Sequence, residues 1–429
     1  MRKGGDAMQV ETVGHGIRYT ECTDPKLCSV LLELHFFLPH AEKTAAACAL
    51  LCDLLTASSE HCPSRAELTQ QLDALYAADF TAKLTQCGDT LMLSFSAEWL
   101  DDAYAPDGTP VTAEMLSLLF DCLHAPNAEN GAFDEEEFRI CRQNLLNDID
   151  CEQNDKRSYA LQKAAEAAFA GEPAALPSYG SRRAAEEMTA ESAFSLWQTL
   201  MRTAPVEAVC VTPVQKPEIR QMLTRLFAGR QRFAPLTVPA PSPCRTAPQH
   251  LCEDAQTVQS KLLLVYKYDD ISYDTVRLLA AVLGSAPNSL LFRNVREQQG
   301  LCYYCGVQPV LLKSTLTVDL GTRREQLAEA ETAVRAQITA MRTGDFPDAL
   351  LEEAKLYLEY GEAVCADSAA GIAAKSLLRP LYGDTRTREE RNAAIRAITK
   401  AALTDAAGKL RLDTVYTLRG SLREGAAPS

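Results

Sequence analysis

Hydrophobic and polar positions follow the same order in the two halves of this chain. Alternate residues are apolar from 30 to 36 in the first half and from 262 to 268 in the second, and each run predicts a strand with one buried face. Residues 50–55 and 279–283 then show the apolar spacing of core-facing helices. Alternation returns at 91–95 and 316–320, so each half is expected to contain at least two strands separated by helix.

The later part of each half continues the parallel. A long helical region is expected from about Phe133 in the first half and from about Phe346 in the second, and each half closes with a helix and a final strand, at 208–211 and 414–418. We interpret the chain as an internal duplication. Strands grouped together and covered by long helices predict an α+β fold in which each half holds an antiparallel sheet.

A proline-rich stretch separates the halves. The sequence APLTVPAPSPCRTAP, residues 234–248, has neither helical nor strand periodicity and is typical of an extended linker. A length of 429 residues also exceeds what one hydrophobic core supports. We therefore predict an N-terminal domain over 1–230, a linker over 231–250 and a C-terminal domain over 251–429.

Composition excludes several classes of partner. Forty-three Lys and Arg against 57 Asp and Glu give a net charge of -14, which disfavours nucleic acid and anionic membranes. No apolar run approaches the roughly 20 residues that cross a bilayer, so we expect a cytoplasmic protein. The 15 cysteines are scattered through apolar segments, and most are expected to be buried thiols. Ordinary packing is also favoured for Cys302 and Cys305, although they form a CxxC pair.

The stretch SLLFRNVREQQGLCYY, residues 289–304, carries the strongest candidate chemistry. An apolar helix is expected to lead into Arg296, end near Gly300 and reverse into a strand with Tyr303 at its start. The guanidinium has five donors suited to a peptide carbonyl or carboxylate, and the phenol can donate to an oxyanion. A structural role is the alternative, because arginine in a last helical turn favours the helix dipole and tyrosine fills sheet edges.

This stretch resembles the C-terminal signature of the pitrilysin/insulinase clan of zinc peptidases, S-x-L-F-x-x-(L/V)-R-E-x-x-G-L-x-Y. The match runs through Ser289, Leu291, Phe292, Val295, Arg296, Glu297, Gly300, Leu301 and Tyr303. The resemblance implies that Arg296 and Tyr303 hold the backbone of a peptide substrate. It also implies that the two halves form a clamshell.

The clan's zinc motif, HxxEH on the first long helix, is missing. None of the six histidines brackets a glutamate in that way, and the corresponding positions hold Ala49, Cys52 and Asp53. We therefore expect no metal in this chain. The alternative is a rebuilt site in which Cys48 and Cys52, four apart on one helical face, are completed by Asp53 or His61. The acidic run at 135–137 is interpreted as the first turn of a helix capped by Asp134.

The resemblance implies a function without catalysis by this chain alone. Some bacterial members of the clan are heterodimers in which one subunit carries HxxEH and the other carries the arginine and tyrosine, and this chain resembles the second kind. Zinc is then expected only in the paralogous partner. The residues from Glu42 to Phe80 resemble a non-catalytic subgroup linked in bacilli to the aminopentanol modification of elongation factor P. The alternatives are a scaffold subunit of the same fold and an independent enzyme with an unusual metal site.

Overall fold

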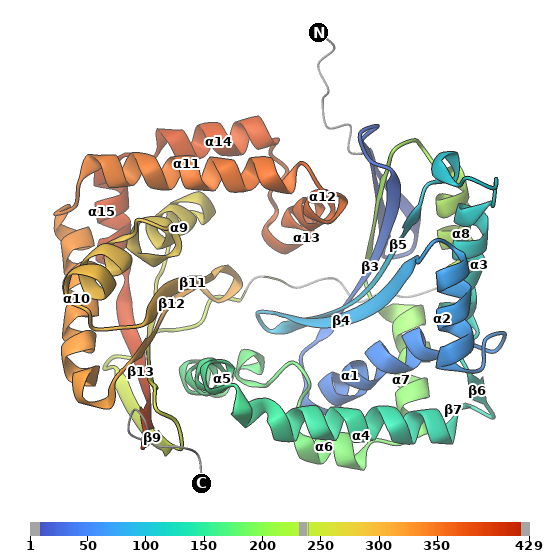
Figure 1. Ribbon diagram of the computed structural model, residues 1–429, viewed down its shortest axis with the longest axis horizontal. Helices are drawn as coiled ribbons and strands as arrows, with labels where there is room; N and C mark the ends of the chain where they lie inside the picture. Colours follow the sequence, from blue (N-terminus) through green and yellow to red (C-terminus); the bar gives the residue numbers. More distant parts are fainter. Residues whose placement is uncertain (1–8, 231–237, 239, 422–429) are drawn as a thin grey trace. The chain divides into compact units, whose positions relative to one another are not determined.

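The computed structural model describes residues 9–230, 238 and 240–421, which divide between two compact units (Figure 1). Unit 1 comprises residues 1–150, 176–238 and 364–385, and unit 2 comprises residues 151–175, 239–363 and 386–429. Each unit is therefore built mainly from one half of the sequence and receives one short segment from the other half. These two exchanged segments, 151–175 and 364–385, cross the division predicted at residues 231–250.

Unit 1 contains a six-stranded sheet with the order β1-β2-β8-β3-β5-β4. The strands are β1 (Gln9–Gly14), β2 (Ile17–Thr23), β3 (Ser29–Pro39), β4 (Asp79–Cys87), β5 (Thr90–Leu100) and β8 (Val206–Thr212). Its helices are α1 (Glu42–Ala57), α2 (Arg65–Ala74), α3 (Val111–His124), α4 (Glu135–Cys151), α6 (Arg182–Glu187), α7 (Ala190–Thr203) and α8 (Pro217–Leu226), with a hairpin of β6 (Ala128–Glu129) and β7 (Ala132–Phe133). The alternating residues predicted for the first strand, among them Leu32, Leu34 and Phe36, are buried in one core with the apolar residues of α1.

Unit 2 contains a five-stranded sheet with the order β11-β12-β10-β13-β9. The strands are β9 (Gln249–Ala255), β10 (Ser260–Lys267), β11 (Tyr304–Val310), β12 (Thr315–Thr322) and β13 (Arg411–Gly420). Its helices are α9 (Tyr273–Ala280), the π-helical segments η4 (Ala281–Ser285) and η5 (Leu291–Gln298), and α10 (Leu327–Thr343), α11 (Asp348–Cys365), α14 (Arg388–Ala397) and α15 (Lys400–Lys409). Across the described ranges of both units, no helix has the length and apolarity needed to cross a membrane.

The two sheets share one strand plan, which confirms the α+β duplication predicted from the sequence. The order β2-β8-β3-β5-β4 in unit 1 corresponds to β9-β13-β10-β12-β11 in unit 2, and β1 is an addition at one edge. One detail differs from the predicted antiparallel sheets. β2 pairs with β8, and β9 with β13, in parallel. In each half the last strand, β8 or β13, lies between this parallel neighbour and the central strand, β3 or β10, with which it pairs antiparallel.

Each exchanged segment places an alanine-rich helix against the sheet formed by the other half of the sequence. Helix α5 (Lys156–Ala168) packs Ala160, Ala164 and Ala168 against the β10 and β13 side chains of unit 2. Helix α12 (Ala369–Ser376), followed by α13 (Leu378–Tyr382), packs Ala369 and Ala373 against β3 and β8 of unit 1. Alanine has no side chain beyond Cβ, so it allows a helix backbone to approach a sheet closely while apolar surface is still buried.

The predicted linker is described only in part, since residues 231–237 and 239 lie outside the described residues. From Ala240 onward the chain is bound along unit 2. The backbone N–H groups of Ala240 and Ser242 donate to the carbonyls of Leu312 and Lys313 at 3.2 and 3.1 Å. Arg245 then lies 3.0 Å from the buried carboxylate of Asp413. This part of the proline-rich stretch is therefore packed against unit 2 and held there by hydrogen bonds and an ion pair.

Candidate functional site

Arg296 and Tyr303 lie on the two arms of a helix–turn–strand element in unit 2. Arg296 is in the π-helical segment η5, and such wide turns are frequent at functional sites. The chain reverses at Gly300, whose φ of 62° is readily adopted by glycine. The Leu301 N–H then donates to the Val295 carbonyl at 3.0 Å, and the Tyr303 N–H donates to the Gly321 carbonyl at 2.8 Å. These bonds fix the start of β11 against the end of β12.

Both side chains reach solvent while each contacts neighbouring residues. The phenol oxygen of Tyr303, a residue that is 43% exposed, accepts from Arg323 Nε at 3.2 Å. The Arg296 side chain is 42% exposed, and its guanidinium carbon lies 4.9 Å from the Phe292 ring centroid. Arg296 Nε is also 3.6 Å from Glu297 Oε1. The element and the adjoining Arg323 thus present a phenol and two guanidinium groups at the surface, which are suited to binding carbonyl or carboxylate oxygens.

Tyr304 anchors this element from the opposite side of the strand. Its ring lies 4.7 Å from the Arg157 guanidinium carbon and 5.1 Å from Lys261 Nζ, and burial raises the pKa of its phenol. A Cβ at Gly321 would lie 2.4 Å from Tyr304 Cε1, so glycine is required for this packing. Arg323, Tyr304 and Gly321 were not among the residues predicted from the sequence. The paired tyrosines were the available signal, since neighbouring strand residues point to opposite faces.

The CxxC pair flanks Tyr303 and belongs to the core of unit 2. Cys302 is buried with Leu301, and Cys305 packs against the same cluster. Both are free thiols. The Cys302 thiol donates to Cys305, which raises the pKa of Cys302 and lowers that of Cys305. These contacts agree with the packing role favoured for the pair.

The positions at which the resemblance places the zinc motif lie on α1 and do not form a zinc-binding set. Ala49 has no donor atom, and burial raises the pKa of the Cys52 thiol to about 12, which disfavours the thiolate that binds metals. The alternative of a rebuilt site is not assembled either: His61 is 67% exposed and its Nδ1 lies 3.6 Å from Asp121. Within the part of the chain that the structure describes, no three His, Cys, Asp or Glu side chains are grouped so as to hold a metal ion.

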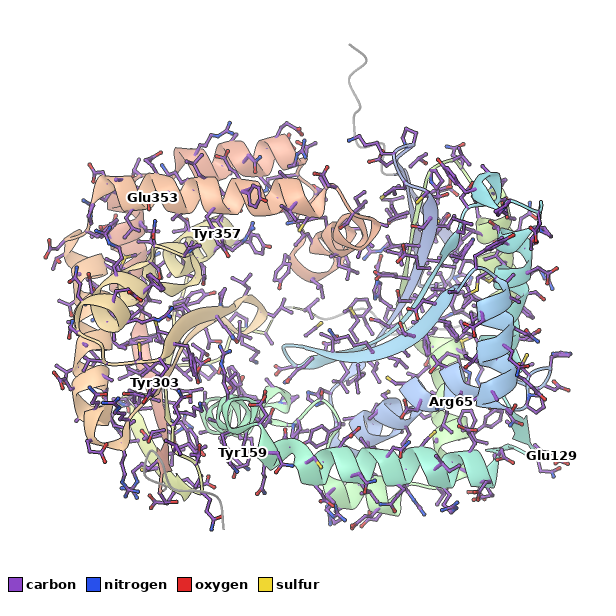
Figure 2. The ribbon with its side chains drawn as sticks, viewed as in Figure 1. Arg65, Glu129, Tyr159, Tyr303, Glu353 and Tyr357 are labelled. Atoms are coloured by element: carbon purple, nitrogen blue, oxygen red, sulfur yellow. The ribbon has the colours of Figure 1, made fainter. Side chains whose placement is uncertain are left out.

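Arg65 supplies a positive charge beside these positions. Arg65, the first residue of α2, has Nη2 3.7 Å from Glu137 Oε1 on α4 (Figure 2). Burial raises the pKa of Asp53 on α1, and the charge of Arg65 opposes that rise. The N–H of Glu137 donates to Asp134 Oδ1 at 2.9 Å, as expected for a capped first turn. Sequence reasoning missed Arg65, because nothing in its local sequence marks proximity to α1 and α4.

Comparison with known proteins agrees with this geometry. Residues 187–358 match the family model described as the peptidase M16 inactive domain. The chain is 24% identical over 406 residues to a Bacillus subtilis protein named probable inactive metalloprotease YmfF, covering 94% of this chain and 95% of that protein.

Two solved structures share the fold over nearly the full length. A conserved protein from Enterococcus faecalis superposes with a TM-score of 0.88 at 25% identity, covering 96% of this chain and 99% of the other. A peptidase M16 inactive domain from Pseudomonas fluorescens gives 0.78 at 17% identity, covering 98% and 100%. The chain is therefore similar over residues 187–358 to the inactive domain of the M16 peptidases, the pitrilysin/insulinase clan, and over nearly its full length to a relative named as an inactive metalloprotease.

Proposed function

We propose that this chain is a catalytically silent subunit that binds peptide and pairs with a paralogue carrying HxxEH. In this proposal zinc and its activated water belong to the partner, and this chain contributes the oxygen-binding surface formed by Arg296 and Tyr303. The pair acts in the cytoplasm on peptide substrates.

The observation that carries the proposal is the contrast between the two units. On α1 the equivalents of the zinc motif are Ala49, Cys52 and Asp53, with the Arg65 guanidinium near the last of them. In unit 2 the arginine and tyrosine of the clan signature remain at the surface of a well-packed turn. A chain that kept a substrate-binding element without a metal-binding set would require its chemistry from another subunit.

The chemistry of the two side chains supports a role in holding peptide. The Arg296 guanidinium has donors for a peptide carbonyl, and the Phe292 ring beneath it restrains its orientation. The Tyr303 phenol lies beside Arg323, and a neighbouring positive charge strengthens an O–H as a hydrogen-bond donor. Both groups could therefore stabilise an oxygen that gains negative charge when a carbonyl is attacked.

The test is reconstitution with the HxxEH paralogue from the same genome. The mixed subunits should cleave unstructured peptides in a chelator-sensitive reaction that neither shows alone. The R296A/Y303F double variant should lower kcat/KM roughly 100-fold or more, because removing one oxyanion donor already costs about that much. Arg293→Ala, an exposed arginine of the same segment η5, is the matched control. Equal cleavage by the double variant and the parent would refute the assigned role.

A scaffold subunit is the second candidate, and the same contacts favour it. Tyr303 and Arg296 each already contact residues of their own chain, as remnants of a former site would. Equilibrium binding of unstructured peptides to the assembled pair separates the candidates, since a scaffold binds no peptide through these residues.

The subgroup resemblance also carries the link to elongation factor P. Mass spectrometry of that factor from cells lacking this gene would test the link.

A further inference from the structure

Helix α11 exposes large apolar side chains on one side. Leu356 is 65% exposed, Tyr357 41% and Tyr360 71%, and we call these three residues the α11 patch. Tyr360 follows Leu356 by four residues and Tyr357 by three, so its side chain neighbours both on one side of the helix. Single exposed apolar residues are common on protein surfaces, whereas several large ones side by side indicate an interaction site.

The opposite face of α11 is fixed by buried apolar and charged contacts. Leu350, Leu351 and Ala354 are buried in the core of unit 2. The Glu362 side chain has no exposed area and is bound by Arg277 at 3.0 Å and Arg391 at 3.2 Å. The α11 patch is therefore presented on a rigid helix. A partner that binds it does not have to order the helix, which reduces the entropic cost of association.

The charges of α11 indicate what kind of partner fits. Glu353 lies about one turn before Tyr357 on α11 (Figure 2). Its carboxylate accepts from the neutral amide of Asn288 at 3.3 Å. Lys355, the lysine of α11, is only 8% exposed. Glu359, beside Leu356 on α11, is bound by Arg396 at 2.5 Å, and their charges balance. Glu353 therefore leaves the border of the patch net negative, in a chain whose net charge is -14. A second copy of this chain would carry the same negative charge and be repelled, while a surface edged with Lys or Arg would be attracted.

We propose that the α11 patch is the centre of a heterotypic subunit interface, and that the partner presents an apolar surface bordered by basic residues. The inference rests on the proposed function, whose HxxEH-bearing paralogue is the partner concerned. Three side chains are too few for a whole interface, which buries about 800 Å² on each side. They are sufficient for its hot spot, where tyrosines and other large side chains dominate the binding energy.

The experiment measures association of the purified paralogue with this chain by isothermal titration calorimetry. We expect L356S/Y360S to weaken Kd at least tenfold. We expect Glu353→Lys to weaken Kd about threefold and to reduce its dependence on salt, because it reverses the charge at the rim. Tyr104→Ser, at a 52% exposed tyrosine in unit 1, is the matched control and should leave Kd unchanged. Urea unfolding of each variant confirms that the folded state is retained.

The outcomes separate this inference from the function on which it rests. If the paralogue binds L356S/Y360S as tightly as the parent, the inference is overturned and the proposed pairing stands. If the parent forms a homodimer that L356S/Y360S dissociates, the occupant is a second copy and the heterotypic assignment is wrong. If the paralogue does not bind the parent at all, both fail. Arg296→Ala should leave association intact while peptide cleavage falls, which distinguishes the interface from the peptide site.

Discussion

Removing the buried carboxylate of Glu362 should destabilise unit 2 selectively. The Glu362 side chain is fully buried between Arg277 and Arg391, whose side chains are only 17% and 9% exposed. Glu362→Ala leaves these two guanidinium groups without their common anion in a site that little water reaches. Breaking a buried ion pair in this way costs about 3–5 kcal/mol. With a urea dependence of about 3 kcal/mol/M, the unfolding midpoint of unit 2 falls by roughly 1–2 M.

The two units can be followed separately in this experiment. Trp99 and Trp197, the two tryptophans of the chain, are both buried in unit 1, so tryptophan fluorescence reports that unit. Hydrogen exchange read by mass spectrometry reports unit 2 from the β10 and β12 amides. Those amides should exchange about 100-fold faster or more in Glu362→Ala, because each 1.4 kcal/mol changes an opening equilibrium tenfold. The tryptophan transition should move much less.

Two controls make the result interpretable. Glu352→Ala removes a carboxylate that is 66% exposed and pairs with Lys355, so it should cost no more than about 1 kcal/mol. Replacing all three members of the buried group, as R277M/E362L/R391M, should recover most of the lost stability because no charge is then left unpaired. If Glu362→Ala is as mild as Glu352→Ala, the buried ion group does not hold α11 and the argument for a rigid patch fails.

Three further predictions follow from contacts of other elements. Gly361→Ala on α11 should stabilise the protein by about 0.5–1 kcal/mol, because a Cβ there meets nothing within 4 Å. Gly371→Ala on α12 should destabilise it, because a Cβ there would clash with the Cys365 carbonyl oxygen. Thermal unfolding of the two variants distinguishes these signs. Burial raises the pKa of Asp53, so unit 1 loses stability as pH rises from the unfolded value of about 3.9 through the raised folded value. Asp53→Asn should therefore raise the tryptophan-monitored midpoint at neutral pH, with the gain disappearing below about pH 4, and an equal gain at pH 3 would contradict this reasoning. Arg157→Ala removes the guanidinium that lies 2.6 Å from the buried Asp319 carboxylate, which should lower the free energy of unfolding of unit 2 by about 2 kcal/mol. Hydrogen exchange in α5 should become faster in this variant and stay unchanged in the control Lys156→Ala.

Local pattern was sufficient for the elements whose burial is set by their own residues. Alternation over 30–36 and 262–268 predicted the central strands β3 and β10, and alternation over 91–95 and 316–320 predicted β5 and β12. The helix that ends near Gly300 and returns at Tyr303 was also predictable, because a glycine next to a polar helix end marks a reversal. The repeat of these patterns in both halves determined the duplication.

Tertiary structure alone decided which sheet each exchanged helix covers. Helices α5 and α12 bury alanines, and an alanine face fits either sheet, so their local sequence contains no information on which unit they join. The proximity of Arg65 to Glu137 and Asp53 likewise depends on how α2 packs beside α1 and α4. Leu356, Tyr357 and Tyr360 are apolar in sequence, and only the packing of α11 through its other face shows that they are exposed. The periodicity of apolar residues indicates which face of a helix or strand is buried. Contacts between elements that are distant in the sequence depend on how the whole chain packs.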